Sequence, residues 1–418
     1  MPSPLITVNQ LSIAFPSAPP VVKNLSFSIS TGERMGFLGL SGSGKSLTAL
    51  ALLGLLPAGA KVTSGTATYY PKEGAPLDLF TLTDRQWQEI RGKEIGLIFQ
   101  EPLTALNPTH RIATQLLEAV EHLRPELTTN QARKEFLTNW LSRVELPKGE
   151  HKRILAAYPH ELSGGQRQRL LIALSLLAEP RFLIADEPTT ALDTITEAAI
   201  LELIDRLRKE MNMGLLFITH DLAVIERITD QALVLQNGEG IHHGATKEIL
   251  ALPNAGLGGG LTSSSTEENT SKNTTTPSSA KVLEVEKLSI SYQSRKAWPW
   301  SKAAIFPAVS EISFTVAAGE WVALVGPSGC GKTTTARHLA GLVPASEGTV
   351  TTFGERPQLV FQDPSSSLNP SHSLRTILHE VLRKQATKSK QSGAKELRQK
   401  SDELLTAVGL PPASYANR

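Results

Sequence analysis

Cysteine is almost absent from this 418-residue chain, which contains only Cys330. A single thiol excludes an internal disulfide framework, a zinc finger and a four-cysteine iron–sulfur site. The scarcity of cysteine suits a reducing compartment.

Charge of one sign and long hydrophobic runs are also lacking. The 42 basic residues nearly balance the 40 acidic ones, so the charge gives no reason to expect a nucleic-acid partner. The first 15 residues lack a basic segment followed by an apolar run, so we expect no signal peptide. The most apolar stretch, Leu47–Leu56, is about half the length of the roughly 20 residues that a membrane helix needs. Any attachment to a membrane is therefore expected to be peripheral and made through a partner.

What the sequence does contain is a repeat. Five segments of the first half return in the same order in the second half, which indicates a duplicated domain. The pairs are Val8–Phe15 with Val285–Tyr292, Asn24–Ile29 with Glu311–Val316, Gly39–Ser46 with Gly326–Thr333, Ile98–Pro102 with Val360–Pro364, and Leu106–Pro108 with Leu368–Pro370.

The segment between the two copies differs in composition. Asn254–Ala280 is rich in Gly, Ser, Thr and Asn and has almost no large apolar residues, so it cannot bury enough surface to offset the entropy of ordering. We therefore predict a first domain over 1–253, a flexible linker over 254–281 and a second domain over 282–418.

Short apolar runs alternate with helical patterns, which is typical of an α/β domain. Buried parallel strands are predicted over Arg34–Leu38, Phe182–Ala185 and Leu215–Thr219. Helices are predicted over Ser46–Leu56 and Thr196–Lys209.

Gly39–Ser46 fits the phosphate-loop pattern G-x-x-x-x-G-K-[ST] between a predicted strand and a predicted helix. Its glycines let backbone N–H groups converge on phosphate oxygens, and the helix dipole adds to the attraction. Lys45 would supply positive charge to the β and γ phosphates, and Ser46 a hydroxyl to Mg²⁺. A chance glycine-rich turn is the alternative. Gly326–Thr333 is a second instance, predicted in the same strand-and-helix context.

The run Phe182–Glu187 has the form of the strand that accompanies a phosphate loop. Asp186 at its end could hold Mg²⁺ through water, and Glu187 could polarise an attacking water. Taken alone the pattern is weak, because apolar strands often end in aspartate.

Leu162–Gln166, with sequence LSGGQ, together with the phosphate loops resembles the signature of the ATP-binding cassette (ABC) family. In that family the signature begins a helix and contacts the γ-phosphate of ATP bound to the opposite cassette. The later runs Asp186–Thr189 and Ala191–Asp193 follow at the family's spacing. The resemblance implies a P-loop NTPase fold of the ABC ATPase type, with a parallel-sheet core, an antiparallel β-subdomain and a helical subdomain. It also implies that the fold is duplicated, with the second copy incomplete.

Further roles follow from the same resemblance. Gln100 matches the glutamine that senses Mg²⁺ and water, and His220 matches the switch histidine near the γ-phosphate. Phe15 and Tyr292 match the aromatic residue that stacks on adenine, although either ring could belong to the core.

The resemblance thus assigns ATP and Mg²⁺ as cofactors and gives a full set of candidate residues. The catalytic candidates are Glu187, His220 and Gln100. The candidates for binding ATP in the first copy are Phe15, Gly39, Ser41, Gly42, Ser43, Gly44, Lys45, Ser46, Leu47, Ser163, Gly164, Gly165 and Gln166. Those in the second copy are Tyr292, Gly326, Ser328, Gly329, Cys330, Gly331, Lys332, Thr333, Thr334 and Gln362. The candidates for holding the metal are Ser46, Gln100, Asp186, Thr333 and Gln362.

Several longer runs resemble the dipeptide, oligopeptide and nickel importer ATPases, and two cassettes on one chain resemble the fused members of that group. The resemblance implies a peripheral ATPase on the cytoplasmic face of the cell membrane that works with permease subunits and, through them, a solute-binding protein. Peptide is the preferred cargo and nickel the alternative. The runs are Phe99–Pro108, Phe361–Pro370, Tyr158–Arg169, Ile184–Asp193 and Asn212–Asp221.

The second copy is expected to be incomplete. Counting from Gln362 as from Gln100 to Ser163, its signature serine would fall near position 425, beyond Arg418. Because the family builds each site from the phosphate loop of one cassette and the signature of another, neither site is expected to be complete within one chain. We expect the lone chain to hydrolyse ATP poorly, and residues 282–418 to be partly unstable or in need of a partner. The second cassette in trans could come from another copy of this chain, with the two first cassettes paired, or from a partner ATPase.

Two other functions remain open at this point. One is a non-transport ABC ATPase of DNA repair or translation, and the other is an inactive, truncated ATP-binding protein. The single cysteine disfavours zinc-finger repair types, and the Ser/Thr/Gly-rich linker differs from the long charged linker expected of ribosome-acting types.

Overall fold

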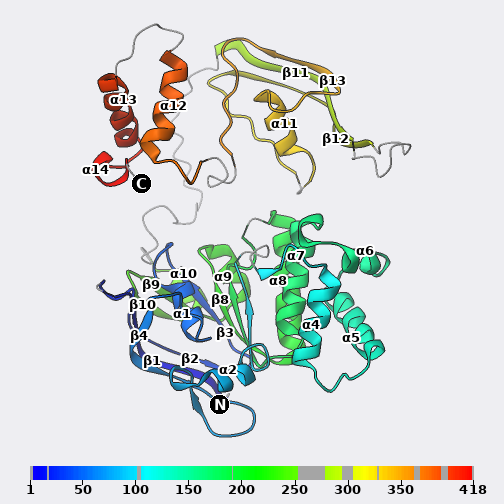
Figure 1. Ribbon diagram of the computed structural model, residues 1–418, viewed down its shortest axis with the longest axis vertical. Coiled ribbons are helices and arrows are strands. Elements are labelled where there is room, and N and C mark those ends of the chain that lie inside the picture. Colours follow the sequence, from blue (N-terminus) through cyan, green and yellow to red (C-terminus); the bar gives the residue numbers. More distant parts are fainter. Residues whose placement is uncertain are drawn as a thin grey trace. The chain divides into compact units, whose positions relative to one another are not determined.

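A computed structural model gives the fold of the chain (Figure 1). It describes residues 3–16, 18–100, 105–190, 192–252, 278–293, 305–326, 329–361, 368–386 and 394–416. The chain divides into two units, Met1–Asn273 and Thr274–Arg418. In the described ranges, every helix is too short or too polar to cross a membrane.

The first unit is built on a six-stranded sheet in the order β10-β9-β3-β8-β7-β6. Its inner strands pair in parallel, and β10 adds one antiparallel edge strand. Alternate residues of β7 point into two different cores: Leu183 and Ala185 into one, Phe182 and Ile184 into the other. The sheet is therefore covered on both faces, which explains its continuous apolar runs. The bounds are β3 Arg34–Leu38, β6 Ile95–Ile98, β7 Phe182–Asp186, β8 Gly214–Ile218, β9 Gln231–Gln236 and β10 Glu239–Ala245.

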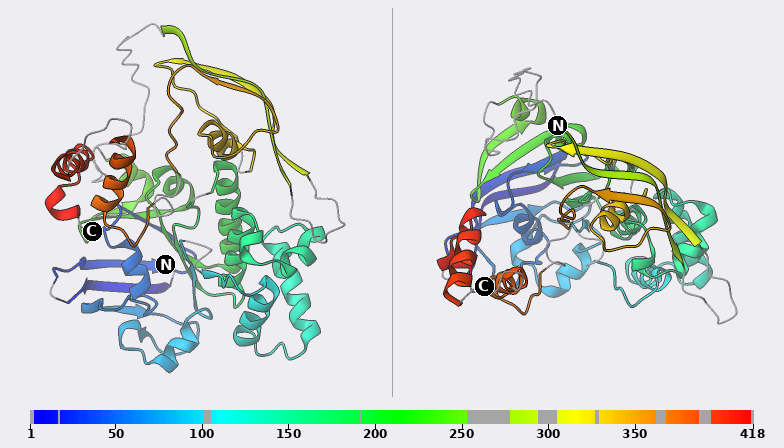
Figure 2. Two further views of the ribbon diagram at one scale, coloured as in Figure 1. Left: turned by 45° about the horizontal axis from the view of Figure 1, so that its top comes forward. Right: turned by 90° about the horizontal axis from the view of Figure 1, so that it is seen from above.

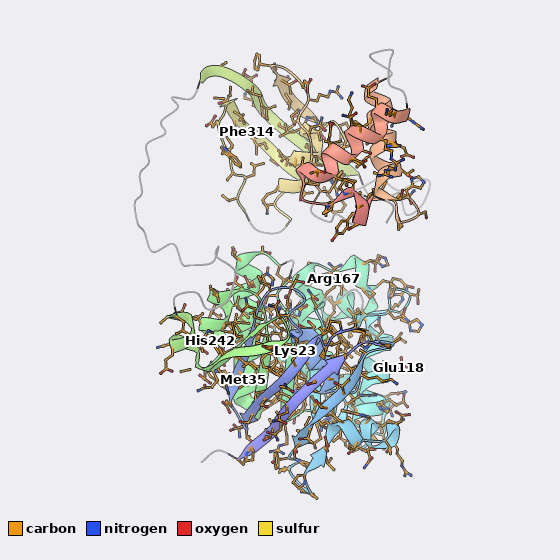
Figure 3. The ribbon with its side chains drawn as sticks, turned by 90° about the vertical axis from the view of Figure 1, so that its left-hand side faces the viewer. Lys23, Met35, Glu118, Arg167, His242 and Phe314 are labelled. Atoms are coloured by element: carbon orange, nitrogen blue, oxygen red, sulfur yellow. The ribbon has the colours of Figure 1, made fainter. Side chains whose placement is uncertain are left out.

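An antiparallel sheet in the order β2-β1-β4-β5 shares one of these cores. In β2 buried and more exposed residues alternate, and its buried Phe27 meets Phe37 of β3 edge to face, with ring centroids 5.0 Å apart. Lys23 of β2 also donates its backbone N–H to Gly238, in the turn before the strand that carries His242 (Figure 3). The bounds are β1 Pro4–Ala14, β2 Val22–Ser30, β4 Lys61–Tyr69 and β5 Leu77–Asp78.

Helices pack on the first unit in separate groups. The teal helices α4, α5 and α6 cluster together with α7, away from the blue strands of the antiparallel sheet (Figure 2). The cluster of helices and the antiparallel sheet are thus two separate parts that accompany the parallel core. The bounds are α1 Lys45–Ala51, α2 Asp84–Ile90, α4 Ile112–Leu123, α5 Asn130–Arg143, α6 His151–Ala156, α7 Gly164–Leu176, α8 Thr194–Met211, α9 Leu222–Ile228 and α10 Thr246–Leu250, with short 3₁₀ turns η1 Leu79–Thr81, η2 Lys148–Glu150 and η3 Pro159–Glu161.

One predicted helix of the first unit is too long. The helix that the sequence predicts over Ser46–Leu56 ends as α1 at Ala51 and continues as turns. Gly54 has a φ of +60° there, where an ideal Cβ would lie 2.6 Å from the Trp87 ring. This left-handed turn, followed by Pro57, explains the early end of the helix.

The second unit contains a three-stranded antiparallel sheet in the order β12-β11-β13, together with four helices in its described part. The strand that the repeat predicts before Gly326 is not formed: residues 320–326 carry no strand, which corrects the predicted context of the second phosphate loop. In the first unit the equivalent strand β3 lies between β8 and β9, whereas the described second unit offers no such partners. The bounds are β11 Ser278–Gln293, β12 Ile305–Ala318, β13 Glu347–Thr352, α11 Lys332–Leu339, α12 Leu374–Ala386, α13 Ala394–Ala407 and α14 Pro412–Tyr415.

Candidate active site

The first phosphate loop connects β3 to α1 and is shaped by its glycines. Gly39 has a φ of +152°, and an ideal Cβ on it would lie 2.3 Å from the carbonyl oxygen of Leu235. Gly44 caps α1 in the left-handed conformation with a φ of 99°. Both positions require glycine, because a side chain would meet backbone or strain the turn. The loop backbone is thereby free to approach a ligand closely.

Lys45 folds back over this loop. Its ammonium donates to the carbonyl oxygen of Gly39 at 2.7 Å and to that of Leu40 at 3.0 Å. The residue is only 6% exposed, and burial lowers the pKa of its ammonium against the opposing effect of Glu187 and Asp186. An ammonium has three donors, so the two carbonyls leave one for a further acceptor.

Ser43 gives independent evidence that the loop fits a phosphate group. Its hydroxyl is buried and has no hydrogen-bond partner among the residues that the structure describes. A buried polar atom without a partner is costly and calls for an explanation. The free hydroxyl, the buried ammonium and the glycine backbone together suit an anionic ligand. Ser41, Gly42, Ser46 and Leu47 belong to the same loop and helix start.

Ser46 and Asp186 meet beside the loop. The Ser46 hydroxyl donates to Oδ1 of Asp186 at 3.0 Å. Burial raises the pKa of Asp186, and the hydrogen bond from Ser46 counteracts part of that rise. A hydroxyl and a carboxylate are oxygen ligands of the kind that Mg²⁺ accepts.

Glu187, the next residue, lies at the centre of the other candidate residues. Its Oε2 accepts from Nε2 of Gln100 at 3.0 Å, and its Oε1 lies 3.1 Å from Nδ1 of His220. The three residues follow β6, β7 and β8, whose carboxyl ends meet at one edge of the sheet. The structure thus brings together all three residues that the sequence proposes as catalytic.

Thr190 is part of this arrangement, and sequence reasoning missed it. Its hydroxyl donates to Oε2 of Glu187 at 3.1 Å. The available signal was a hydroxyl residue three positions after the glutamate, within a turn. That pattern has no chemical meaning until the position of the carboxylate is known.

The signature residues begin α7. Ser163 is the N-cap, and its hydroxyl accepts the N–H of Gln166 at 3.2 Å in a capping box. An ideal Cβ on Gly165 would lie 2.8 Å from Cγ2 of Thr196, whereas one on Gly164 would meet Leu192 at 3.4 Å. Within the described part of the first unit, no hydrogen bond joins Ser163 to the phosphate loop of its own cassette.

The structure leaves the remaining candidates untested. Phe15 is half-buried and packs against the core beside the antiparallel sheet, while Tyr292 is exposed.

The second phosphate loop repeats a contact of the first, because Nζ of Lys332 donates to the carbonyl oxygen of Gly326 at 2.6 Å. Ser328 and Gln362 lie outside the described residues. Gly329, Cys330 and Gly331 precede α11, whose first turn holds Thr333 and Thr334.

Comparison with known proteins identifies the class. The family described as "ABC transporter" matches residues 22–190 and 309–416. The chain is 34% identical to a glutathione import ATP-binding protein, GsiA, of Pectobacterium atrosepticum, with 98% of this chain and 71% of that protein covered. It is 37% identical to the uncharacterized ABC transporter ATP-binding protein YejF of Escherichia coli, with 92% and 74% covered.

Solved structures show the same fold. The dimeric, post-hydrolysis ATP-binding cassette MJ0796 bound to ADP and Pi aligns with a TM-score of 0.50 at 26% identity, covering 58% of this chain and 99% of that one. The cassette cbiO1 of Clostridium perfringens aligns with a TM-score of 0.51 at 25% identity, covering 60% and 91%.

The chain therefore belongs to the ABC transporter family, as one of its ATP-hydrolysing subunits. The predicted α/β P-loop fold and the predicted ATPase class are confirmed. The relatives do not favour the alternative of a DNA-repair or translation ATPase.

Proposed function

We propose that this chain binds ATP and Mg²⁺ at the loop Gly39–Ser46 and hydrolyses ATP with Glu187 as general base, so as to power the import of peptide-like solutes. The observation that carries the proposal is the position of the Glu187 carboxylate. It lies between Gln100 and His220 and directly follows the Ser46–Asp186 pair. These residues come from four separate segments of the first unit and converge on one place.

The nucleotide phosphates would lie against Lys45, the Ser43 hydroxyl and the backbone of the glycine loop. Ser46, Asp186 and Gln100 would hold Mg²⁺, which when bound neutralises charge on the phosphates. The described residues form no cluster of three or more His, Cys, Asp or Glu side chains. The metal would therefore depend on the hydroxyl, on the phosphates and on water for its remaining ligands.

Glu187 would act on the attacking water. Its carboxylate accepts a proton as the water oxygen bonds to the γ-phosphorus, and the bond to the ADP oxygen breaks. Gln100 would orient that water, and His220 would hold Oε1 of Glu187 on the side of the γ-phosphate.

A second cassette in trans would complete the site. The hydroxyl and glycines of the signature, Ser163–Gly165, begin α7 and are not bonded to their own phosphate loop in the described first unit. A helix N-terminus with glycine at its first positions suits the γ-phosphate of a nucleotide bound elsewhere. The dimeric form of the cassette MJ0796 bound to ADP and Pi supports this arrangement.

The cargo and partners rest on the relatives. GsiA is named as a glutathione import ATP-binding protein, and glutathione is a tripeptide. We therefore extend the proposal to peptide-like small solutes, with permease subunits in the membrane, a solute-binding protein outside it, and this chain on the cytoplasmic face.

The ATPase proposal is tested with the full chain. Steady-state phosphate release should fall about 100-fold or more in Glu187→Ala, because the general base is lost. Glu226→Ala, an exposed glutamate on α9, serves as the matched control and should retain the wild-type rate. An unchanged rate in Glu187→Ala would overturn the catalytic role.

The transport proposal is tested with the permease subunits. The chain should co-purify with them, and vesicles containing the complex should take up labelled glutathione or dipeptide only when ATP is supplied. Uptake that is equal with and without ATP would contradict the proposal.

A further inference from the structure

The carboxylate of Glu187 has one partner that belongs to its own turn. Gln100 and His220 approach it from the segments after β6 and β8, whereas Thr190 lies three residues further along the same segment. Gln100 and Thr190 share Oε2, at 3.0 Å and 3.1 Å, and His220 faces Oε1. One oxygen therefore carries two donors and the other faces the histidine.

The backbone of this turn is fixed independently of the side chains. Glu187 has a φ of +44°, in the left-handed region that L-residues rarely adopt. Its N–H donates to the carbonyl oxygen of Ile218 at 2.9 Å, and the N–H of Thr190 closes the turn on the carbonyl oxygen of Glu187 at 3.2 Å. Because backbone bonds already hold the turn, the Thr190 hydroxyl is free to act on the carboxylate alone.

We propose that Thr190 is a positioning residue that fixes the orientation of the Glu187 carboxylate during ATP hydrolysis. This inference rests on the proposed role of Glu187 as general base. The bonds from Gln100 and His220 depend on where the neighbouring loops lie, but Thr190 moves together with Glu187. Whether or not Gln100 also donates to Oε2, the hydroxyl of Thr190 holds that oxygen, and Oε1 keeps a lone pair that can accept the proton.

The low exposure of the Glu187 side chain makes the hydrogen bond from Thr190 more important. The side chain of Glu187 is only 16% exposed, so a wrongly rotated carboxylate is poorly compensated by water. A hydrogen bond to a charged group is stronger than one between neutral groups. General-base catalysis also requires the base within hydrogen-bond reach of the proton that it accepts.

The experiment replaces the hydroxyl while keeping the shape of the side chain. Thr190→Val removes the donor, and Thr190→Ser restores it. Thr138→Val is the matched control, because Thr138 is exposed on α5 and donates its hydroxyl to a helix carbonyl instead. Single-turnover hydrolysis of radiolabelled ATP with the full chain in excess gives the rate constant, and equilibrium titration gives the Kd for ATP.

We expect Thr190→Val to lower the hydrolysis rate constant about tenfold or more, with the Kd for ATP within about twofold of wild type. Thr190→Ser should recover most of the rate, and Thr138→Val should equal wild type. A wild-type rate constant in Thr190→Val, or a valine variant whose only change is weaker ATP binding, would overturn the inference.

The background variant Glu187→Ala separates this inference from the proposed function. In that background Thr190→Val should cause no further loss, because the carboxylate that it positions is gone. An additional loss of similar size would show that Thr190 acts elsewhere. If wild type hydrolyses ATP no faster than Glu187→Ala, the general-base role itself fails, and the inference fails with it.

Discussion

The hydroxyl of Ser46 donates to Oδ1 of Asp186 across 3.0 Å, although the two residues are 140 positions apart in the chain. Ser46 lies in the first turn of α1 and Asp186 ends β7. The contact joins the phosphate loop to the strand that the catalytic candidate Glu187 directly follows. It places both residues at the carboxyl edge of a parallel sheet, where ligands of α/β folds bind.

The raised pKa of Asp186 predicts a pH-dependent stability. Burial lifts the pKa of Asp186 above the ordinary value of 3.8. The contribution of this group to the free energy of unfolding is therefore fully present below pH 3.8, and it is lost as pH rises through the folded-state pKa. Asp186→Asn cannot ionise and keeps an oxygen for Ser46. We expect this substitution to raise the Tm for unfolding of the first unit at pH 7, with a smaller increase in Tm at pH 4.

Calorimetry of the full chain at both pH values checks this prediction, with wild type measured beside the variant. A gain of the same size at pH 4 and pH 7 would show that the ionisation of Asp186 is not its source.

Packing around the signature predicts that alanine substitutions at two adjacent glycines change the free energy of unfolding by different amounts. An ideal Cβ on Gly165 would lie 2.8 Å from Cγ2 of Thr196, and Thr196 is itself held by two hydrogen bonds to Asp193. Gly165→Ala should therefore push α7 away from α8 and cost about 1–3 kcal/mol. In Gly164→Ala the added Cβ makes only an ordinary contact at 3.4 Å. Its higher helix propensity should raise the free energy of unfolding by up to about 1 kcal/mol.

Urea unfolding of the two variants beside wild type measures the difference. The prediction is wrong if Gly165→Ala is as stable as Gly164→Ala.

The elements of the first unit were largely predictable because each signal was local. The runs around β3, β7 and β8 are continuously apolar, and these strands are buried on both faces. Gln100, Glu187 and His220 could be proposed from motif order, since each follows a recognisable strand. Their mutual hydrogen bonds could not, because they depend on the order of strands in the sheet.

Two features lay beyond sequence reasoning. Thr190 bonds to Glu187 within a turn whose backbone is left-handed at Glu187, a conformation that the residue types there do not predict. The missing strand before Gly326 depends on pairing with distant strands, and the local apolar run around Val325 gives no warning of it.

The two phosphate loops predict unequal ATP binding. Lys45 and Lys332 make the same contact with the first glycine of their loops, at 2.7 Å and 2.6 Å. Leu38, which precedes the first loop, is fully buried in β3, whereas Val325 before the second loop is 89% exposed. A loop on a fixed strand is better preorganised for phosphate, so the first loop should bind ATP more tightly.

Lys45→Ala and Lys332→Ala form the matched pair for this test. Lys45→Ala removes a charged hydrogen bond to the phosphates. It should therefore raise the Kd of the tighter ATP site about 10- to 100-fold. Lys332→Ala should leave that affinity unchanged. Calorimetric titration with ATP distinguishes them, and the reverse result would assign the tighter site to the second loop.

The exposed residues before the second loop predict where proteases cut first. Trp321 is 98% exposed in a segment that forms no strand, whereas Trp140 of the first unit is 1% exposed within a core. Cleavage tracks the local opening of the backbone, so brief chymotrypsin digestion should cut after Trp321 well before any site in the first unit. Trp321→Ala should slow that cut, with Trp87→Phe as the control. Mass spectrometry of the early fragments decides the outcome: equal resistance of the two units would contradict the predicted instability of the second unit.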